Sequence, residues 1–289
     1  MKLTQLFNHE KPMLSFEVFP PKNNEAYENV KDSIEKIAQL HPDYMSVTYG
    51  AGGGTSVFTS QIAANIQNNF GVSSLAHLTC ISSDKETVRS QLEILKENGV
   101  ENILALRGDI KKGEEPGENR EFKFASDLIK EIKSFGDFCI GGACYPEGHT
   151  ESETQKEDIL HLKEKVDCGC DFLTTQMFFD NNILYNFLYK IREAGITVPV
   201  VAGIMPVTNS KQIKRICELS GTVLPRRFTA IVDRFGSDEA SMTEAGIAYA
   251  TDQIIDLYAN GVNAVHVYSM NKPYVAEKIL DNLSSILGR

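Results

Sequence analysis

The amino-acid sequence predicts an α/β fold, a single (β/α)8 TIM barrel over residues 1–289 with an extra helix before the last repeat. Two observations support this fold. Short β-rich segments alternate with longer helical patterns along the whole chain, and glycine recurs between a helical pattern and the next strand. No Pro-, Ser- or Gly-rich linker divides the chain, and barrels of this class commonly reach about 250 residues as one domain.

Eight segments are predicted to be strands, because each is short, rich in β-branched or aromatic residues and followed by a helical pattern. Such a succession is typical of a parallel sheet that is closed by crossover helices. The predicted strands are residues 13–19, 44–49, 73–80, 102–106, 138–143, 172–176, 198–204 and 264–268.

Helix boundaries carry their own signals. Ser83 and Glu86 have the spacing of a capping box ahead of an apolar i, i+4, i+7 stripe, which suits a helix on the outside of a barrel. Residues 226–236 are the predicted extra helix. The glycines expected to end helices in a left-handed conformation are Gly99, Gly169, Gly195 and Gly261.

Two segments are predicted to be functional or flexible loops. Residues 52–56 contain three consecutive glycines but lack the lysine of a P-loop and the spacing of a dinucleotide-binding turn. We expect a flexible loop that ends in a helix N-cap there. Residues 110–119 form a long irregular stretch after a strand, which is typical of a lid over a site.

The composition argues against several classes of function. A net charge of −10 disfavours binding to nucleic acid or to anionic membrane surfaces. No stretch approaches about 18 consecutive apolar residues, and the start lacks the apolar core of a secretory signal, so we expect a cytoplasmic protein. The six cysteines are expected to be reduced and buried. Cys168 and Cys170 form an isolated C-x-C pair, so no metal site is predicted.

Polar residues stand where the predicted strands end, which is where barrels of this class carry their functional groups. Glu17 shares a strand face with Ser15, and Pro20 and Pro21 stop the strand directly afterwards. A carboxyl group that points inward among apolar groups has a raised pKa, as a general acid requires at neutral pH. An ion-paired carboxylate on the barrel rim is an equally acceptable interpretation.

Three other strand ends offer groups that a ligand could use. In Arg107-Gly108-Asp109, the arginine offers a cation, the glycine lets a ligand approach the backbone closely, and the aspartate could accept hydrogen bonds from an amino-pyrimidine edge. A turn at the surface that is held by a salt bridge would have the same sequence. His77 is either a ligand contact or a structural residue. Gln176 would bond to a heterocycle edge or to a neighbouring loop.

Taken together, the strand-end motifs resemble those of the methylenetetrahydrofolate reductases. The resemblance runs in order from about residue 13 to residue 272, and the ordered set is far more specific than any single motif. The motifs are S-F-E-V-F-P-P-K (15–22), S-V-T-Y-G-A (46–51), H-L-T-C (77–80), A-L-R-G-D (105–109), A-S-D-L (125–128), Y-P-E-G-H (145–149) and T-Q-M-F-F-D (175–180).

The resemblance implies FAD-dependent reduction of 5,10-methylenetetrahydrofolate to 5-methyltetrahydrofolate, which feeds methionine synthesis. It implies NADH or NADPH as electron donor, a ping-pong hydride transfer through flavin N5, and a homo-oligomer. Glu17 matches the acid that protonates the folate nitrogen, and Asp109 matches a catalytic carboxylate beside the flavin and the pterin. Gln176 matches the amide that contacts folate and nicotinamide in turn.

The binding positions of the family also fall on residues of this chain. Because the net charge of the chain is −10, Arg107 and Lys165 are expected to supply the local positive charge that an anionic cofactor needs. The FAD positions are Thr48, His77, Arg107, Gly108, Asp109, Ala125, Tyr145, His149, Asp158 and Lys165. The folate positions are Glu17, Asp109, Gln176, Gln212 and Lys272.

Several positions depart from the family pattern. Lys272 stands where an arginine is common, so the bidentate fork of arginine is lost. Ile216 stands where bacterial relatives can carry a phenylalanine that stacks on folate, and His161 and Glu164 replace an asparagine and an arginine beside the adenosine of FAD. The chain ends soon after the last repeat, so the regulatory domain of eukaryotic relatives is not expected.

Two other functions stay open at this point. A pterin-binding methyltransferase barrel would use a folate pocket without flavin, but it leaves Glu17 and the flavin-side motifs unexplained. A non-catalytic flavin- or folate-binding regulator usually loses its proton donor, whereas this chain keeps Glu17, Asp109 and Gln176.

Overall fold

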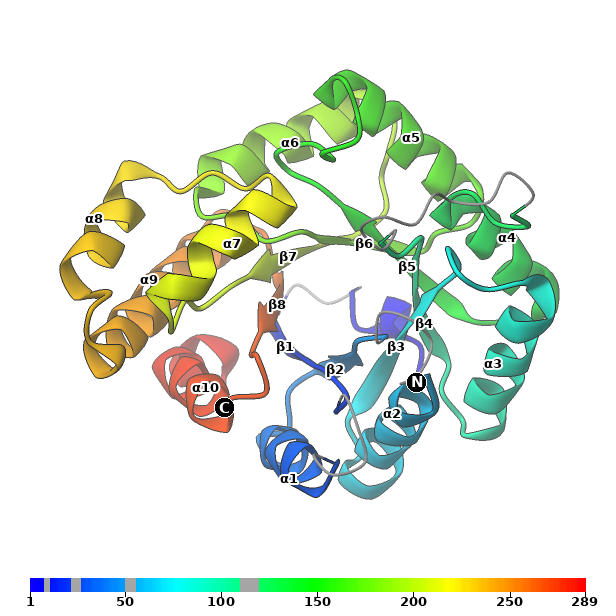
Figure 1. The fold of residues 1–289 in the computed structure, drawn as a ribbon, viewed down its shortest axis with the longest axis horizontal. Coiled ribbons are helices and arrows are strands. Elements are labelled where there is room, and N and C mark those ends of the chain that lie inside the picture. Colours follow the sequence, from blue (N-terminus) through cyan, green and yellow to red (C-terminus); the bar gives the residue numbers. More distant parts are fainter. Residues whose placement is uncertain (8–10, 22–26, 50–55, 110–119) are drawn as a thin grey trace.

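The computed structural model describes residues 1–7, 11–21, 27–49, 56–109 and 120–289. Within these ranges, eight parallel strands pair in chain order to form a closed barrel, and helices surround it (Figure 1). The predicted (β/α)8 barrel is therefore confirmed. The strands are β1 (Met13–Val18), β2 (Tyr44–Val47), β3 (Ser73–Thr79), β4 (Asn102–Leu106), β5 (Cys139–Cys144), β6 (Phe172–Thr175), β7 (Val200–Ile204) and β8 (Ala264–Tyr268).

Helices follow the strands on the outside of the barrel. None of the described helices combines the length and the apolar run that crossing a lipid bilayer would take. The helices are η1 (Leu3–Gln5), α1 (Tyr27–Ala38), α2 (Ser56–Phe70), α3 (Lys85–Glu97), α4 (Ala125–Phe135), α5 (Gln155–Asp167), α6 (Asn181–Glu193), α7 (Ser210–Ser220), α8 (Arg226–Phe235), α9 (Glu239–Ala259) and α10 (Pro273–Leu287).

Every predicted strand is present, and the observed ends differ from the predicted ones by at most two residues. The seventh strand begins at Val200 rather than at Val198, because Pro199 has no N–H group to contribute to the sheet. The predicted extra helix is confirmed as α8. Segments 52–55 and 110–119 lie outside the described residues, so the predictions for them stay predictions.

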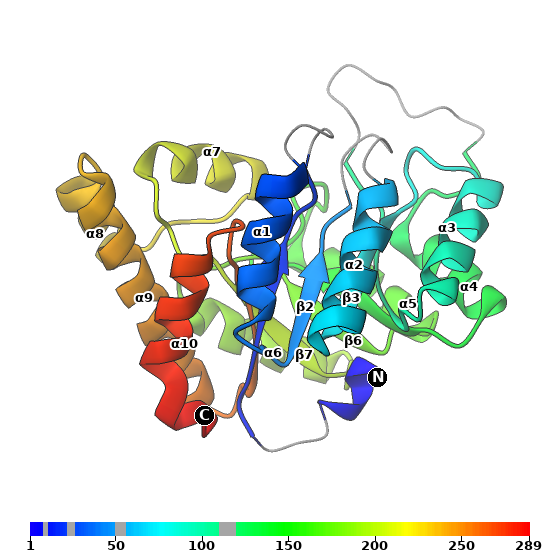
Figure 2. The same ribbon diagram turned by 90° about the horizontal axis from the view of Figure 1, so that it is seen from below.

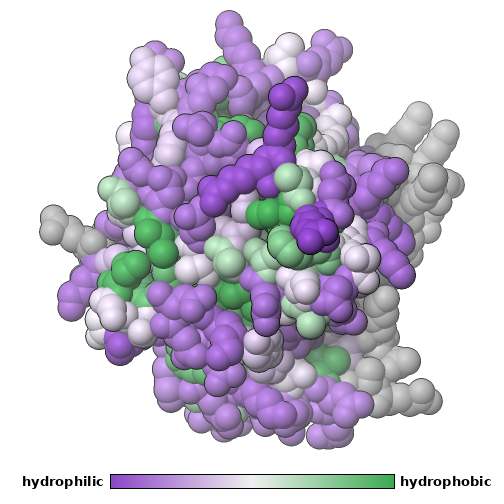
Figure 3. Space-filling model, turned by 90° about the vertical axis from the view of Figure 1, so that its left-hand side faces the viewer, coloured by the Kyte–Doolittle hydropathy of each residue, from purple (hydrophilic) through white to green (hydrophobic). Residues whose placement is uncertain are grey.

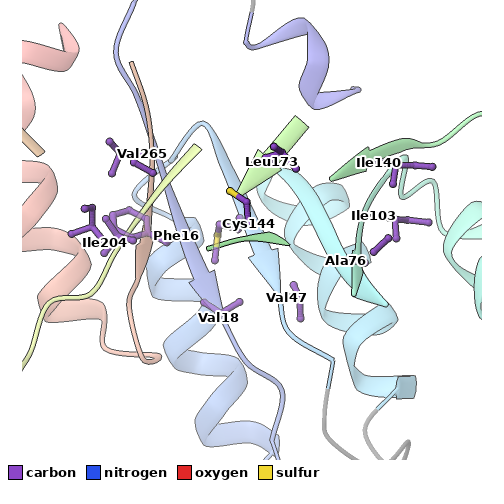
Figure 4. Close-up of a cluster of buried hydrophobic side chains, with 14 of the residues drawn as sticks. Phe16, Val18, Val47, Ala76, Ile103, Ile140, Cys144, Leu173, Ile204 and Val265 are labelled. Carbon is purple, nitrogen blue, oxygen red and sulfur yellow. The ribbon is translucent and has the colours of Figure 1, made fainter. Parts of the chain in front are cut away.

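The two faces of the barrel strands have different roles. Side chains that point outward form the main apolar core with the surrounding helices, as Phe16, Val47, Ile103, Leu173 and Val265 illustrate (Figure 4). Side chains that point inward alternate with them, so Ser15 and Glu17 of β1 face the barrel interior, as predicted. The outward side chains therefore stabilise the barrel, and the inward side chains at the strand ends can contribute to a binding site.

The amino-terminal end of the barrel is closed by a second apolar cluster. Leu3 of η1 is fully buried there, and its N–H group donates to Asn102 Oδ1 at 2.8 Å. Figure 2 shows η1 at the end of the barrel opposite α7. The buried members of this cluster are Leu3, Met13, Tyr44, Leu75, Leu104, Cys139, Phe172 and Val201.

The predicted glycine positions are confirmed, and one predicted cap is wrong. Gly99, Gly169, Gly195 and Gly261 adopt φ angles of 73°, 111°, 79° and 80° after their helices. The N-cap of α3 is not Ser83 but the next residue, Asp84, whose side chain accepts from Thr87 N–H at 2.8 Å. Aspartate is as good an N-cap residue as serine, so the predicted N-cap was wrong by one residue.

Three helices, α7, α8 and α9, lie between β7 and β8 and form an enlarged side of the molecule. They share a third apolar cluster, made of Met177, Phe179, Val207, Ile213, Phe228, Met242 and Tyr249. The outer surface of this side is mostly hydrophilic with small separate hydrophobic areas (Figure 3). The six cysteines are free thiols, of which Cys168 and Cys217 are only partly buried.

Candidate active site

A cleft of about 340 Å³ opens at the carboxyl-terminal end of the barrel. Small-molecule sites usually have volumes of about 300–1,000 Å³. The strand ends, the loops after them and α7 form its walls. The lining residues are Glu17, Arg107, Asp109, Tyr145, His149, Thr150, Glu151, Gln176, Met177, Met205, Ile216, Leu219, Ser220 and Tyr268.

Some of the residues predicted from the sequence meet in this cleft. They come from the ends of β1, β4, β5 and β6 and from the loop after β5. Their shared location supports one site, while their individual roles stay predictions. The predicted residues in the lining are Glu17, Arg107, Asp109, Tyr145, His149 and Gln176.

Glu17 lines the cleft from the carboxyl-terminal end of β1. Its side chain keeps 21% of its surface exposed, and its Oε2 lies 3.6 Å from His77 Nε2 on β3. Burial raises the pKa of the Glu17 carboxyl to about 8 and lowers the pKa of the His77 imidazole to about 3. At pH 7 the pair is thus a neutral acid beside a neutral imidazole, which favours the general-acid interpretation over an ion pair.

The His77 ring has an unused polar atom. The residue is buried, and among the described residues its Nε2 has no hydrogen-bond partner. Buried polar atoms without a partner are uncommon in folded proteins. A ligand group that accepts from or donates to this nitrogen, according to the tautomer of the ring, would satisfy it.

Polar side chains continue into the barrel below Glu17. The buried ring of His266 on β8 lies between two hydroxyl groups, with Nδ1 2.7 Å from Ser15 Oγ and Nε2 2.9 Å from Ser46 Oγ. It also stacks on Tyr44, with ring centroids 5.4 Å apart. Burial lowers the pKa of His266 to about 3, so this interior layer is polar but uncharged.

The segment after β4 supplies charged groups at the rim. Arg107 Nη1 and Nη2 donate to the two carboxylate oxygens of Glu151 at 2.5 and 2.6 Å, and this contact raises the pKa of Arg107. The positive charge expected for an anionic cofactor is therefore paired with an acid in this structure. Gly108 has a backbone φ of +87°, which residues other than glycine rarely adopt. The next residue, Asp109, is exposed.

Two aromatic rings form one wall of the cleft. Tyr145 and His149 meet edge to face, with ring centroids 4.6 Å apart. Burial raises the pKa of Tyr145 to about 12, so its hydroxyl remains protonated. Asp158 of α5 accepts a hydrogen bond from the backbone N–H of His149, and it supports this loop from outside the cleft lining.

Tyr268 reaches the cleft because Gly203 of β7 has no side chain. The Tyr268 hydroxyl donates to the Thr175 carbonyl oxygen at 2.5 Å. A Cβ atom at Gly203 would lie 2.4 Å from that hydroxyl and 2.4 Å from the same carbonyl oxygen. Gln176 is the next residue after Thr175 in the chain, and its Oε1 accepts from Met177 N–H at 3.0 Å.

The remaining predicted residues do not line the cleft. Lys165 Nζ donates to the Ala143 carbonyl oxygen at 2.6 Å, and burial lowers the pKa of Lys165. Lys272 Nζ donates to Thr208 Oγ1 at 2.7 Å. The residues in this group are Thr48, His77, Gly108, Ala125, Asp158, Lys165, Gln212 and Lys272.

Several lining residues were not assigned from the sequence. Tyr268 was noted as the end of the last predicted strand, but it was given no role in the site. Glu151 had no such signal, because its partner Arg107 is 44 positions away in the chain. Leu219 of α7 also had no signal and is 73% exposed in the lining, whereas Ile216, one turn earlier, was noted in the sequence as the position of a folate-stacking phenylalanine.

A family model and the sequence relatives of this chain agree on one family. Residues 2–284 match a model of the family described as methylenetetrahydrofolate reductase. The Escherichia coli (strain K12) protein named 5,10-methylenetetrahydrofolate reductase is 34% identical over 270 residues, which cover 93% of this chain and 90% of that protein. A Zea mays protein named methylenetetrahydrofolate reductase (NADH) 1 is 35% identical over 298 residues, which cover 99% of this chain. The chain spans 50% of the length of that plant relative.

A solved structure shows a similar fold. It is described as an uncharacterized protein from Clostridium thermocellum that binds two copies of 5-methyl-5,6,7,8-tetrahydrofolic acid. The TM-score is 0.66, and the match covers 99% of both chains at 17% sequence identity. At this identity the likeness concerns the fold alone.

Proposed function

The chain belongs to the methylenetetrahydrofolate reductase family, and on this premise we propose that it reduces 5,10-methylenetetrahydrofolate to 5-methyltetrahydrofolate, with a nicotinamide dinucleotide as electron source. The product would feed methionine synthesis. The observation that carries the proposal is the Glu17 carboxyl, which faces the cleft and has a pKa raised to about 8. Such a group holds a proton at neutral pH and can donate it to a bound substrate.

Three residues of the cleft would each have a separate role toward the folate. Glu17 would donate its proton to the folate nitrogen, so that the five-membered ring opens to an iminium. The Asp109 carboxylate is an acceptor only, which suits the amino-pyrimidine edge of the pterin. Gln176 offers both a donor and an acceptor, so its amide would serve folate and nicotinamide in turn at one shared cleft.

We propose FAD as the cofactor, held by the residues that match the family's positions. When bound, FAD would carry a hydride from the nicotinamide to the folate. The described residues fit a planar ring with polar edges, because His77 Nε2 has no hydrogen-bond partner among them and Tyr145 and His149 form an aromatic wall. The residues proposed to hold FAD are Thr48, His77, Arg107, Gly108, Asp109, Ala125, Tyr145, His149, Asp158 and Lys165.

The absorption spectrum of the purified protein tests this function. We expect a yellow protein, or one that becomes yellow with FAD, whose flavin band is bleached by NADH or NADPH and restored by methylenetetrahydrofolate. A colourless protein that cannot be loaded with FAD would favour a pterin-binding methyltransferase. A yellow protein that responds to neither substrate would point to a flavin-binding regulator.

Replacing Asp109 by asparagine is expected to weaken folate binding about 10- to 100-fold, because a hydrogen bond to a charged group contributes about 1.5–3 kcal/mol. Removing a negative charge beside the flavin should also raise its reduction potential. Titration with folate and a potentiometric measurement check both effects. Asp233→Asn, which neutralises an exposed carboxylate on α8, is the matched control. Unchanged affinity and potential in Asp109→Asn would remove Asp109 from the site.

A further inference from the structure

The strand that carries Glu17 loses one of its two sheet partners, β8, immediately after this residue, while its pairing with β2 continues to Val18. The pairing of β1 with β8 ends at Glu17 and Tyr268. Pro20 and Pro21 follow, and proline has no N–H group to donate to a neighbouring strand. The backbone groups of Glu17 and Phe19 on the side of β8 therefore need partners other than this strand.

Two side chains from the turn between β8 and α10 supply these partners. Ser269 Oγ donates to the Glu17 carbonyl oxygen at 2.6 Å. Asn271 Oδ1 accepts from Phe19 N–H at 2.9 Å, and Asn271 Nδ2 donates to the Phe19 carbonyl oxygen at 2.8 Å. The side-chain amide of Asn271 thus replaces the missing strand and occupies both backbone groups of Phe19.

The turn adopts an uncommon conformation to make these contacts. Met270 and Asn271 have φ angles of 54° and 51°, in the left-handed region that residues other than glycine rarely enter. Lys272 N–H donates to the Ser269 carbonyl oxygen at 3.0 Å and closes the turn. A conformation of this kind persists where its surroundings determine it, and here it directs the Asn271 amide at β1.

We propose that Ser269 and Asn271 are positioning residues, which hold the backbone at Glu17 and Phe19 so that the Glu17 carboxyl keeps its place in the cleft during proton donation to folate. This inference rests on the proposed function. Neither side chain is among the residues that line the cleft, so both act through Glu17. A misplacement of about 1 Å at a reacting group can cost about 100-fold in rate, which makes such a support consequential.

Asn271→Gly gives the sharpest test, because glycine keeps the left-handed backbone and removes only the amide. We expect reoxidation of the reduced flavin by methylenetetrahydrofolate to slow roughly 10- to 100-fold. Flavin reduction by NADH should stay within about twofold of the wild-type rate, because it needs no proton from Glu17. The apparent pKa of the folate step should fall, since a looser Glu17 carboxyl gains contact with water.

Paired variants separate positioning from a general loss of structure. Ser269→Ala should repeat the selective loss, and Ser269→Thr, which keeps a hydroxyl group, should restore the folate step. Asn282→Ala removes an amide of α10 that is bonded at 3.4 Å to Thr251, and it should behave as wild type.

The outcomes are distinct. Wild-type folate rates in both Asn271→Gly and Ser269→Ala would overturn the proposal, and so would an equal loss in the two half-reactions. A wild-type protein that reduces its flavin but never passes electrons to folate would instead refute the proposed function.

Discussion

Glu17→Gln is expected to leave flavin reduction by the nicotinamide intact and to slow the folate half-reaction by roughly 10²- to 10⁴-fold, the usual contribution of a general acid. Glutamine keeps the size of the side chain and can still hydrogen-bond, but it has no acidic proton to give. Following the two half-reactions separately by the flavin absorbance checks the prediction. If both half-reactions run at wild-type rates, Glu17 is not the acid.

The same carboxyl sets the expected pH dependence of the wild-type protein. Because burial raises the pKa of Glu17 to about 8, its neutral form is present below that pH and is lost as the pH rises through it. The folate step should therefore be nearly constant up to about pH 7, be halved near pH 8, and approach a fall of about tenfold per pH unit above about pH 9. His77 adds no second transition near neutral pH, because its pKa is lowered to about 3. In Glu17→Gln this high-pH decline should disappear.

Gly203→Ala is expected to destabilise the protein by about 2–3 kcal/mol, as overpacking of a filled interior does. The added Cβ would lie 2.4 Å from the Thr175 carbonyl oxygen, which belongs to the neighbouring strand β6 and cannot move alone. The Tyr268 hydroxyl, at 2.4 Å, would also be displaced. Thermal unfolding should show a midpoint lowered by roughly 5–10 °C.

Gly136→Ala is the matched control for this effect. Its Cβ would meet only the Phe138 ring, at an ordinary distance of 3.6 Å, and the backbone of Gly136 is extended. We expect a change in unfolding free energy within about 1 kcal/mol. Equal midpoints for Gly203→Ala and Gly136→Ala would show that Tyr268 and β6 adjust freely to the added methyl group.

The barrel was predictable from sequence because its signals are local. Each strand is a short β-rich run, and each glycine after a helix, such as Gly99 or Gly261, marks a chain reversal within a few residues. The errors were also local. Asp84 rather than Ser83 caps α3, because two good capping residues stand side by side.

The site was less predictable, because its contacts join distant parts of the chain. Strand-end placement indicated Glu17, Asp109 and Gln176, and the structure brings them into one cleft. No sequence pattern pairs Arg107 with Glu151, and none sends Lys165 to the Ala143 carbonyl oxygen. Such pairings depend on how loops and helices pack in three dimensions, which residue spacing does not encode.

The contact that closes the barrel also has a consequence for biosynthesis. Ser15 Oγ donates to the Val265 carbonyl oxygen across 250 positions, and β1 pairs with β8 over the same interval. At about 5–20 residues per second, a ribosome would need roughly 12 to 50 s to produce the last strand after the first. During that time one edge of the strand that bears Glu17 has no partner, so the nascent chain is expected to depend on chaperones until its final strand emerges.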